Sequence, residues 1–306
     1  MSKSIRNKTI STTIEEGKKY LDRCVNVNNK QNNLSNIINK TILGNTFDVL
    51  PLLPEKSIDL IIVDPPYNIT KNYSGNKFNR KSDEEYIDYT HSWLKLVKPL
   101  LKDTGSIYVC IDWCSGIIVG NILKEYFIIQ NRITWQREKG RGSKDNWKNG
   151  LEDIYFCTNS NNYTFNLDNV KIRKKVIAPY KENGKPKDWE ETEQGNFRNT
   201  CPSNFWNDIT IPFWSMPENT DHPTQKSEKL LAKIILASSN ENDIILDPFV
   251  GSGSTSVTAK KLNRNYIGIE QEKQYCVFTE QRLEMAEINK NIQGYEDGIF
   301  YERNML

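Results

Sequence analysis

Short apolar runs, each bounded by charged or polar residues, recur at intervals along most of the chain. Seven of them predict buried β-strands, and they cover residues 41–45, 58–64, 105–112, 128–136, 152–159, 243–247 and 265–270. Other stretches carry apolar residues at helical spacing, and they cover residues 83–98, 115–126, 227–239, 254–262 and 272–289. Strands that alternate with helices in this way predict a doubly wound α/β sheet.

The helix over 83–98 has the clearest predicted boundaries. Ser82 and Glu85 stand at the spacing of a capping box, in which each residue satisfies a free backbone N–H of the other. Pro99 limits the far end, because proline disfavours the helical conformation of the residue before it. The sequence therefore predicts a helix that begins after Ser82 and ends before Pro99.

The alternation lapses in three places, and these lapses divide the chain. Residues 1–40 are polar and rich in asparagine, which predicts an irregular or weakly helical lead-in. Residues 160–217 scatter aromatic side chains among prolines, asparagines and lysines, a composition typical of an inserted module. The α/β unit is then made of 41–159 and 218–290, and residues 291–306 form a carboxyl-terminal tail.

Composition excludes several classes of protein. No stretch approaches 18 consecutive apolar residues, and the amino terminus lacks the apolar segment of a signal peptide, so we expect a cytoplasmic protein with no membrane contact. The six cysteines form no C-x-x-C pair, and only His91 and His222 could assist them as ligands. We therefore expect neither a structural metal nor a disulfide framework.

The net charge of +2 hides a local excess of positive charge. Residues 132–187 contain thirteen Lys or Arg against six Asp or Glu, so the rest of the chain is slightly acidic. Such a segment is either a solvated face or a surface that binds phosphates.

One predicted strand ends in a glycine-rich corner, "LDPFVGSGST" at 246–255. A strand, a tight turn and a helix form the geometry in which a nucleotide-like cofactor meets a helix amino terminus. Gly251 and Gly253 permit positive φ and close approach of a ligand, and Glu270, at the end of the next strand, is placed to accept hydrogen bonds from ribose hydroxyls. The third glycine of a dinucleotide fingerprint is missing, and a plain strand-to-helix turn is the alternative.

A second predicted strand ends in "VDPPYN" at 63–68. Two prolines stiffen the main chain and remove backbone donors, so Asp64 and the Pro65 carbonyl form a rigid pair of acceptors beside the ring of Tyr67. This arrangement suits a planar group that bears an amine, such as a nucleobase flipped out of a duplex. A rigid turn that merely ends the strand is the alternative.

Together with "HPTQK" at 222–226, these two corners resemble the amino-group DNA methyltransferases that use S-adenosylmethionine. The Asp-Pro-Pro-Tyr corner comes first and the glycine corner last, which is similar to the circularly permuted beta group. The resemblance covers residues 41–290 and implies a Rossmann-like methyltransferase sheet, mostly parallel and of about seven strands. It also implies that the insert at 160–217 is a target-recognition region.

The resemblance assigns roles to individual residues. The catalytic residues that it implies are Asp64, Pro65, Pro66 and Tyr67. The cofactor-binding residues that it implies are Asn45, Asp64, Pro65, His222, Thr224, Gln225, Lys226, Asp247, Phe249, Gly251, Ser252, Gly253, Ser254 and Glu270. Asn45 departs from the aspartate that the family commonly carries at this place. Thr224 as a helix cap, Lys226 as a solvated side chain and Phe249 as a core residue are the alternatives.

The basic segment supplies the expected DNA-binding residues, which are Lys139, Arg141, Lys144, Trp147, Lys148, Arg173, Lys174 and Lys175. Positive charges interleaved with glycines and with Trp135 and Trp147 combine phosphate binding with stacking surface. We expect Arg173, Lys174 and Lys175 to contact phosphates rather than bases.

The resulting hypothesis is a bacterial or phage-encoded DNA adenine-N6 methyltransferase, the modification partner of a restriction endonuclease. The resemblance also suggests a homodimer. Cytosine-N4 methylation is the nearest alternative, although members of that group usually have Ser where this chain has Asp64. A protein-glutamine methyltransferase usually carries its glycine corner before the Pro-Pro-Tyr corner, opposite to the order here. A catalytically silent DNA-binding subunit of the same fold is the alternative from a different class.

Overall fold

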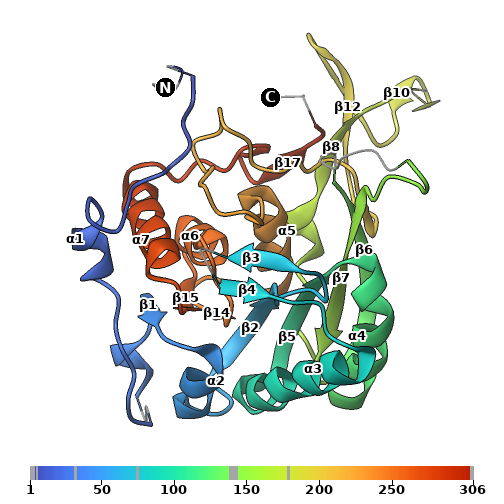
Figure 1. The fold of residues 1–306 in the computed structure, drawn as a ribbon. Coiled ribbons are helices and arrows are strands. Elements are labelled where there is room, and N and C mark those ends of the chain that lie inside the picture. The colour runs from blue at the N-terminus through green and yellow to red at the C-terminus, as the bar shows by residue number, and fades with distance from the viewer. Residues whose placement is uncertain are drawn as a thin grey trace.

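A computed structural model describes residues 4, 6–30, 33–73, 76–137, 144–177 and 180–303. Its centre is an eight-stranded sheet in the order β1-β15-β14-β2-β5-β7-β6-β13 (Figure 1). The strands are β1 (Lys40–Leu43), β2 (Ile58–Val63), β5 (Leu101–Ile111), β6 (Ile128–Gln136), β7 (Leu151–Thr158), β13 (Phe205–Trp206), β14 (Ile244–Asp247) and β15 (Asn265–Glu270). All seven predicted strands are present, and the eighth strand, β13, comes from within the insert.

Most pairs in this sheet are parallel, as predicted, and only β7 runs antiparallel to its two neighbours. The two strands that end in the motif corners are adjacent, with Ile245 opposite Leu60 and Leu246 opposite Ile61. The carboxyl ends of parallel neighbours meet at one edge of a sheet, which is where α/β proteins bind their ligands. The fold therefore brings together two corners that lie about 180 residues apart in the sequence.

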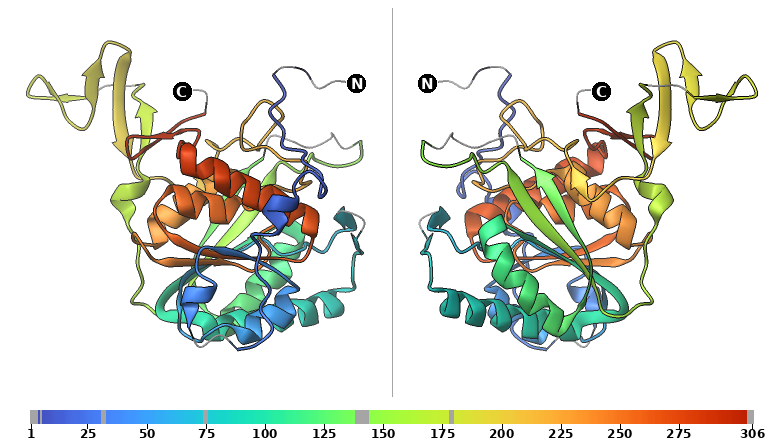
Figure 2. Two further views of the ribbon diagram at one scale, coloured as in Figure 1. Left: turned by 90° about the vertical axis from the view of Figure 1, so that its left-hand side faces the viewer. Right: turned by 90° about the vertical axis from the view of Figure 1, so that its right-hand side faces the viewer.

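Helices cover both faces of the sheet (Figure 2). One face carries α5 (Glu228–Ser238), α6 (Ser254–Lys261) and α7 (Lys273–Ile288), and the other carries α3 (Asp83–Val97) and α4 (Trp113–Tyr126). Side chains of β2 alternate between them: Leu60 and Ile62 pack on the α5 side, and Ile61 and Val63 on the α3 side. Burial of a strand on both faces explains why the run reads as continuously apolar.

The predicted capping box at the start of α3 is present. The Ser82 hydroxyl accepts a hydrogen bond from the Glu85 backbone N–H, and the Glu85 carboxylate accepts one from the Ser82 N–H. The α-helix ends at Val97, and Pro99 lies in a single 3₁₀ turn, η3 (Lys98–Leu100), that leads directly into β5. Each capping bond satisfies a donor that the helix itself cannot satisfy.

The insert builds a second, five-stranded sheet in the order β11-β12-β8-β17-β16. Its strands are β8 (Ile172–Lys175), β11 (Glu190–Thr192), β12 (Gly195–Thr200), β16 (Tyr295–Glu296) and β17 (Ile299–Tyr301). The carboxyl-terminal residues thus form part of this sheet, because β17 pairs with β8. This sheet and the hairpin of β9 (Lys181–Glu182) and β10 (Lys185–Pro186) stand away from the main sheet, and together they are called the arm (Figure 2).

The polar lead-in is anchored to the body of the protein. Its short helix α1 (Lys18–Leu21) packs against α7, Val25 pairs with Ile42 beside β1, and Ile10 pairs with Thr220. The remaining short elements are η1 (Leu34–Asn36), α2 (Thr46–Val49), η2 (Leu50–Leu52), β3 (Lys71–Tyr73), β4 (Asn76–Phe78) and η4 (Leu167–Val170). Within the described residues, no helix is both long enough and apolar enough to cross a membrane.

Candidate active site

A cavity of about 380 Å³ lies at the carboxyl edge of the sheet, between the two motif corners. Almost all of the predicted catalytic and cofactor-binding residues line it, namely Asn45, Asp64, Pro65, Pro66, Tyr67, His222, Thr224, Gln225, Lys226, Asp247, Phe249, Gly251, Ser252, Ser254 and Glu270. Gly253 is the exception: it does not line the cavity and is the residue directly before α6. A concave site with a few converging polar groups is the usual form of a small-molecule site.

The glycine turn has the backbone that the sequence predicts. Gly251 and Gly253 have φ angles of 55° and 82°, in the left-handed region that costs other residues strain. A Cβ on Gly251 would lie 2.9 Å from Nε2 of His222, and a Cβ on Gly253 would lie 2.9 Å from the Cα of Thr279. Both positions therefore need glycine for conformation and for space.

Two carboxylates hold the ends of this turn. Asp247 accepts hydrogen bonds from the Phe249 N–H at 2.9 Å and from the Thr255 hydroxyl at 2.5 Å. Glu270 accepts one from the Gly251 N–H at 3.0 Å. Burial raises the pKa of Asp247 and of Glu270 to about 7 each, although these hydrogen bonds oppose the shift. Each carboxylate has lone pairs left for a ligand in the cavity.

The segment 222–226 forms another wall. His222 packs edge-on against Tyr275 at a centroid distance of 4.3 Å, and its Nδ1 accepts a hydrogen bond from the Thr224 N–H. The side chain of Gln225 ties the segment to the preceding loop, through bonds with Thr220 and Glu218. The alternative reading of Thr224 as a helix cap is wrong, because α5 begins at Glu228 with Ser227 before it.

Lys226 turns inward, so the alternative of a solvated side chain is also wrong: only 9% of the residue is exposed. Its ammonium donates to Asp64 Oδ2 at 2.8 Å and to the Tyr67 hydroxyl at 3.0 Å. The Tyr67 hydroxyl also lies 2.7 Å from Asp64 Oδ1. Both oxygens of the Asp64 carboxylate therefore have partners within the protein.

Two further charged residues complete this network, and neither of them belongs to a motif in the sequence. Glu152, near the start of β7, lies 2.7 Å from the Lys226 ammonium through Oε1. Its other oxygen lies 2.9 Å from Nη1 of Arg137, which directly follows β6. The only sequence signal was an acidic pair, "ED" at 152–153, opening an apolar run in a basic segment.

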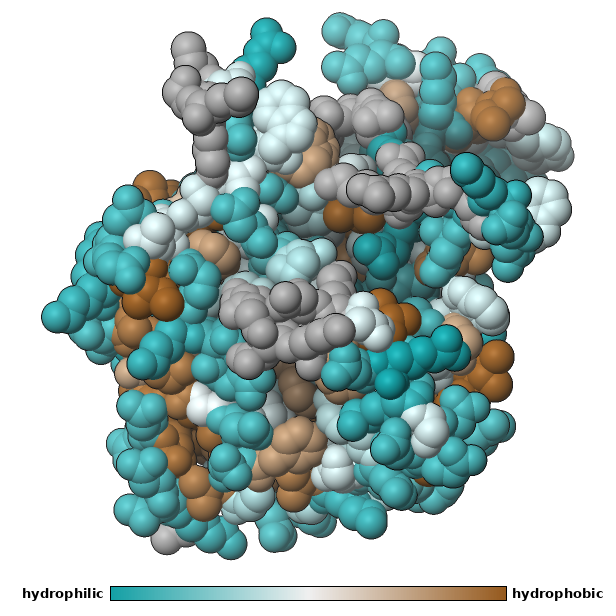
Figure 3. All heavy atoms as spheres, viewed as in Figure 1, coloured by the Kyte–Doolittle hydropathy of each residue, from teal (hydrophilic) through white to brown (hydrophobic). Residues whose placement is uncertain are grey.

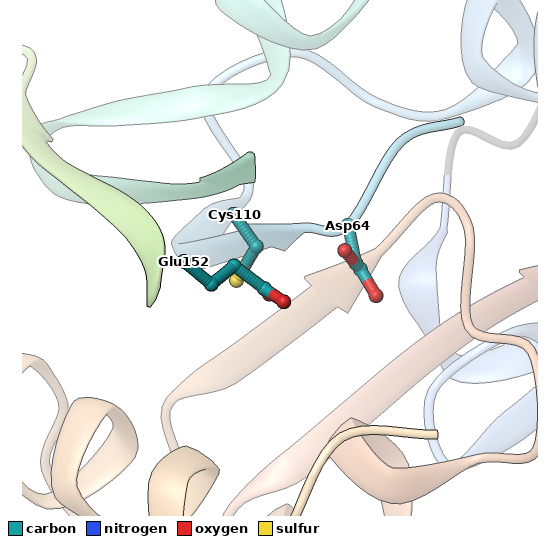
Figure 4. Close-up of side chains that lie close together, drawn as sticks. All are labelled: Asp64, Cys110 and Glu152. Atoms are coloured by element: carbon teal, nitrogen blue, oxygen red, sulfur yellow. The ribbon is translucent and has the colours of Figure 1, made fainter. Parts of the chain in front are cut away.

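The network contains three side chains of the kinds that bind metal ions. The ligand atoms of Asp64, Cys110 and Glu152 lie within 4.8 Å of one another (Figure 4). The Lys226 ammonium lies within hydrogen-bond distance of both carboxylates, so the chain itself supplies a positive charge there. Burial raises the pKa of the Cys110 thiol well above its usual value, which keeps it neutral and a poor ligand. This chemistry does not favour a metal centre.

The predicted DNA-binding residues that the structure describes fall into two groups, and neither group lines the cavity. Lys144, Trp147 and Lys148 are exposed in the segment between β6 and β7, and Trp147 is 93% exposed. Lys139 and Arg141 lie outside the described residues. Trp135 is buried on β6 and donates to the Ile209 carbonyl, so it is not available for stacking as expected.

The second group lies on β8 in the arm. Arg173 is paired with Glu190 at 3.1 Å and stacks over Phe197, which gives it a structural role within the arm. Lys174 lies 3.6 Å from Glu302, and Lys175 is exposed. The region where Figure 1 labels β8, β10 and β12 is largely hydrophilic, with isolated hydrophobic residues (Figure 3).

Relatives of the chain include two bacterial methyltransferases. Type II methyltransferase M.HpaI of Haemophilus parainfluenzae is 35% identical over 250 residues, which cover 80% of this chain and 74% of that protein. DNA adenine methyltransferase YhdJ of Escherichia coli strain K12 is 33% identical over 255 residues, which cover 81% of this chain and 83% of that protein.

Solved structures share the fold. The cytosine-N4-specific PvuII DNA methyltransferase is similar with a TM-score of 0.60 and 17% identity, over 82% of this chain and 92% of that one. TTHA0409 of Thermus thermophilus, solved with S-adenosyl-L-methionine, has a TM-score of 0.55 and 17% identity. The match covers 87% of this chain and 98% of that one. The DNA methylase family matches residues 58–281, nearly three quarters of the chain, and the protein belongs to this family.

Proposed function

We propose that the protein transfers a methyl group from S-adenosylmethionine to the N6 amine of an adenine that is flipped out of DNA. The observation that carries the proposal is the shared cavity. The Asp64 corner and the glycine corner both line this cavity, which has a volume of about 380 Å³. One corner presents acceptors for an amine, and the other has the form of a cofactor site. Membership of the DNA methylase family supports the reaction class.

The residues around the glycine turn fit the cofactor. S-adenosylmethionine supplies an electrophilic methyl group on a positively charged sulfonium. Glu270 would accept hydrogen bonds from ribose hydroxyls, and the buried carboxylate of Asp247 would face the positive charge of the methionine end. The glycines let the ligand approach the main chain closely. Asn45 is exposed at the rim, with an amide that can contact the adenine edge.

The Asp64 corner would prepare the amine for attack. The lone pair of an aromatic amine is delocalised into the ring, which makes the nitrogen a poor nucleophile. If Asp64 and the Pro65 carbonyl accept the two N–H groups, the nitrogen turns toward tetrahedral geometry and its lone pair becomes available. Rigid acceptors aimed at charge that develops in the transition state are often the largest catalytic contribution. Tyr67 would stack on the flipped base.

The product distinguishes this function from its rivals. Purified protein is incubated with the cofactor and unmethylated DNA, the DNA is digested, and methylated nucleosides are measured by mass spectrometry. We expect N6-methyladenine. N4-methylcytosine would select the cytosine enzyme, and no product on any DNA would support a silent DNA-binding subunit. Asp64 in place of the usual Ser, together with the adenine-specific relative YhdJ, favours adenine.

Cofactor binding is expected to strengthen as the pH rises through 7. Burial raises the pKa values of Asp247 and Glu270 to about 7, above the ordinary carboxyl range, so each gains its negative charge only near that pH. A cationic cofactor prefers the ionised forms. Isothermal titration calorimetry should show about 10-fold tighter binding at pH 8 than at pH 6 for each coupled carboxyl. Glu270→Gln should reduce this slope, and an unchanged slope would contradict the assignment.

DNA binding is expected to depend on lysines of the arm. Replacing Lys174 and Lys175 with Ala should lower the slope of log affinity against log salt by about 1 to 2, because each phosphate contact releases a counterion. Fluorescence anisotropy with a duplex at several salt concentrations measures this slope. Lys290→Ala, which removes an exposed lysine near the far end of α7, is the matched control and should leave it unchanged. An unchanged slope in the arm variant would indicate a solvated face.

The restriction–modification context supplies the remaining proposals. We infer a cognate restriction endonuclease as genetic partner, a cytoplasmic site of action and a homodimer. The names of relatives such as M.HpaI, a Type II methyltransferase, support the first of these. Long-read sequencing of DNA from a host that expresses the protein would identify the recognised site.

A further inference from the structure

The acceptor on which catalysis depends is already occupied by the protein itself. Asp64 Oδ2 accepts a hydrogen bond from the Lys226 ammonium at 2.8 Å, and Oδ1 accepts one from the Tyr67 hydroxyl at 2.7 Å. Under the proposed function, on which this inference rests, Asp64 must accept a hydrogen bond from the target amine. A carboxylate oxygen that already holds an ammonium is a weaker acceptor for a neutral amine, so the amine and the Lys226 ammonium compete for the same carboxylate.

Glu152 offers the same two donors a second acceptor. Its Oε1 lies 2.7 Å from the Lys226 ammonium and 2.8 Å from the Tyr67 hydroxyl, so neither donor has to move far to leave Asp64. The residue is only 1% exposed, and Arg137 fixes its other oxygen at 2.9 Å. A buried carboxylate held in this way is a stationary partner for a mobile ammonium.

We propose that Glu152 is a positioning residue: it takes over the Lys226 ammonium and the Tyr67 hydroxyl when the target amine binds Asp64. The exchange keeps the ammonium paired with a carboxylate, which avoids the large cost of an isolated ammonium in the cavity. It also releases Asp64 for the amine. Arg137 directly follows β6 and lies within the basic segment 132–187, so the anchor of Glu152 belongs to the part of the chain expected to face DNA.

The charge on Lys226 provides a readout of this role. Groups that face its ammonium from the surrounding elements are Asp64, Tyr67, Cys110, Glu152 and Asp247. Burial alone would lower the pKa of Lys226, but the attraction of Asp64 and Glu152 raises it above the ordinary lysine value. Removal of the Glu152 charge should lower this pKa again.

The test uses the full chain with Glu152→Gln, which keeps the shape of the side chain and removes its charge. Single-turnover methylation, with saturating cofactor and a duplex that carries the recognised site, should slow by about 10- to 100-fold at pH 7.5. The deficit should shrink as the pH rises toward the lowered pKa of Lys226, because a lysine that has lost its proton competes only weakly for Asp64. Asp153→Asn, the neighbouring acid on β7, should leave both the rate and the pH profile unchanged.

A second substitution separates competition from a purely structural role. Adding Lys226→Gln to Glu152→Gln removes the competitor, so the double variant should be faster than Glu152→Gln alone at pH 7.5. Glu152→Asp, which keeps the charge, should retain the pH profile of the wild type. The proposal is overturned if the double variant is slower still, if the Glu152→Gln deficit is the same at every pH, or if Glu152 variants lose cofactor binding through misfolding. Failure of the proposed function would appear separately, as a wild-type protein that yields no N6-methyladenine.

Discussion

Replacing Asp64 with Ala is expected to lower kcat by about 10²- to 10³-fold or more, the usual cost of losing a preorganised polar group at the reacting centre. The affinity for S-adenosylmethionine should change little, because the glycine turn is held by Asp247 and Glu270. The fold should also survive, since Lys226 keeps Glu152 as a partner and no buried ammonium is left alone. Steady-state kinetics, calorimetry with the cofactor and thermal unfolding measure the three quantities.

A matched control is available on the same strand. Asp59 pairs with Lys102 at 2.7 Å and accepts a hydrogen bond from the Ile244 N–H, at the end of β2 opposite to the cavity. Asp59→Ala should lower thermal stability and leave kcat nearly unchanged. If Asp64→Ala instead unfolds the protein while Asp59→Ala does not, the corner is a structural turn and not a catalytic one.

The main sheet was predictable because its strands carry strong local signals. Runs such as 58–64 are continuously apolar, and a strand buried on both faces leaves few other ways to hide such a run. The eighth strand, β13, has only two residues and pairs with β6 through contacts distant in sequence. No local pattern identifies a strand of that length.

The ends of the chain were less predictable for the same reason. Residues 291–306 carry no sustained periodicity, yet Ile299–Tyr301 pairs with β8, and Phe300 is fully buried there. The lead-in likewise gains its order from tertiary contacts, such as the pair of Ile10 with Thr220. Short segments of this kind acquire structure from the surface on which they pack, and a single sequence does not contain that information.

The candidate site divides in a similar way. Asp64, Gly251 and His222 belong to contiguous sequence motifs that predicted their roles, and all three residues line one cavity. Glu152 and Arg137 belong to no motif, and they reach the site because β6 pairs with β7 and β7 in turn pairs with β5. A prediction that these two residues reach the site would need the register of the sheet and the directions of their side chains.

The glycine turn gives the other large expected effect: Gly253→Val should force the main chain of the turn to move, and so weaken cofactor binding by about 100-fold. A left-handed conformation costs a substituted residue about 1–2 kcal/mol, and overpacking adds about 1–3 kcal/mol. A Cβ at this position would lie 2.6 Å from Cγ2 of Thr279 and 2.9 Å from its Cα, so the contact includes backbone that cannot rotate away. Calorimetry with S-adenosylmethionine measures the loss.

A substitution at Gly184 separates the effect of backbone strain from the effect of steric crowding. Its φ of 77° is close to the 82° of Gly253, but a Cβ there would meet no atom of the described residues within 4 Å. Gly184→Val should therefore cost about 1–2 kcal/mol of stability from conformation alone, with cofactor binding unchanged. Thr279→Ser should not rescue Gly253→Val, because the Thr279 Cα remains in the way. Wild-type affinity in Gly253→Val would mean that the turn can move aside, and the close packing between the start of α6 and α7 would then not shape the cofactor site.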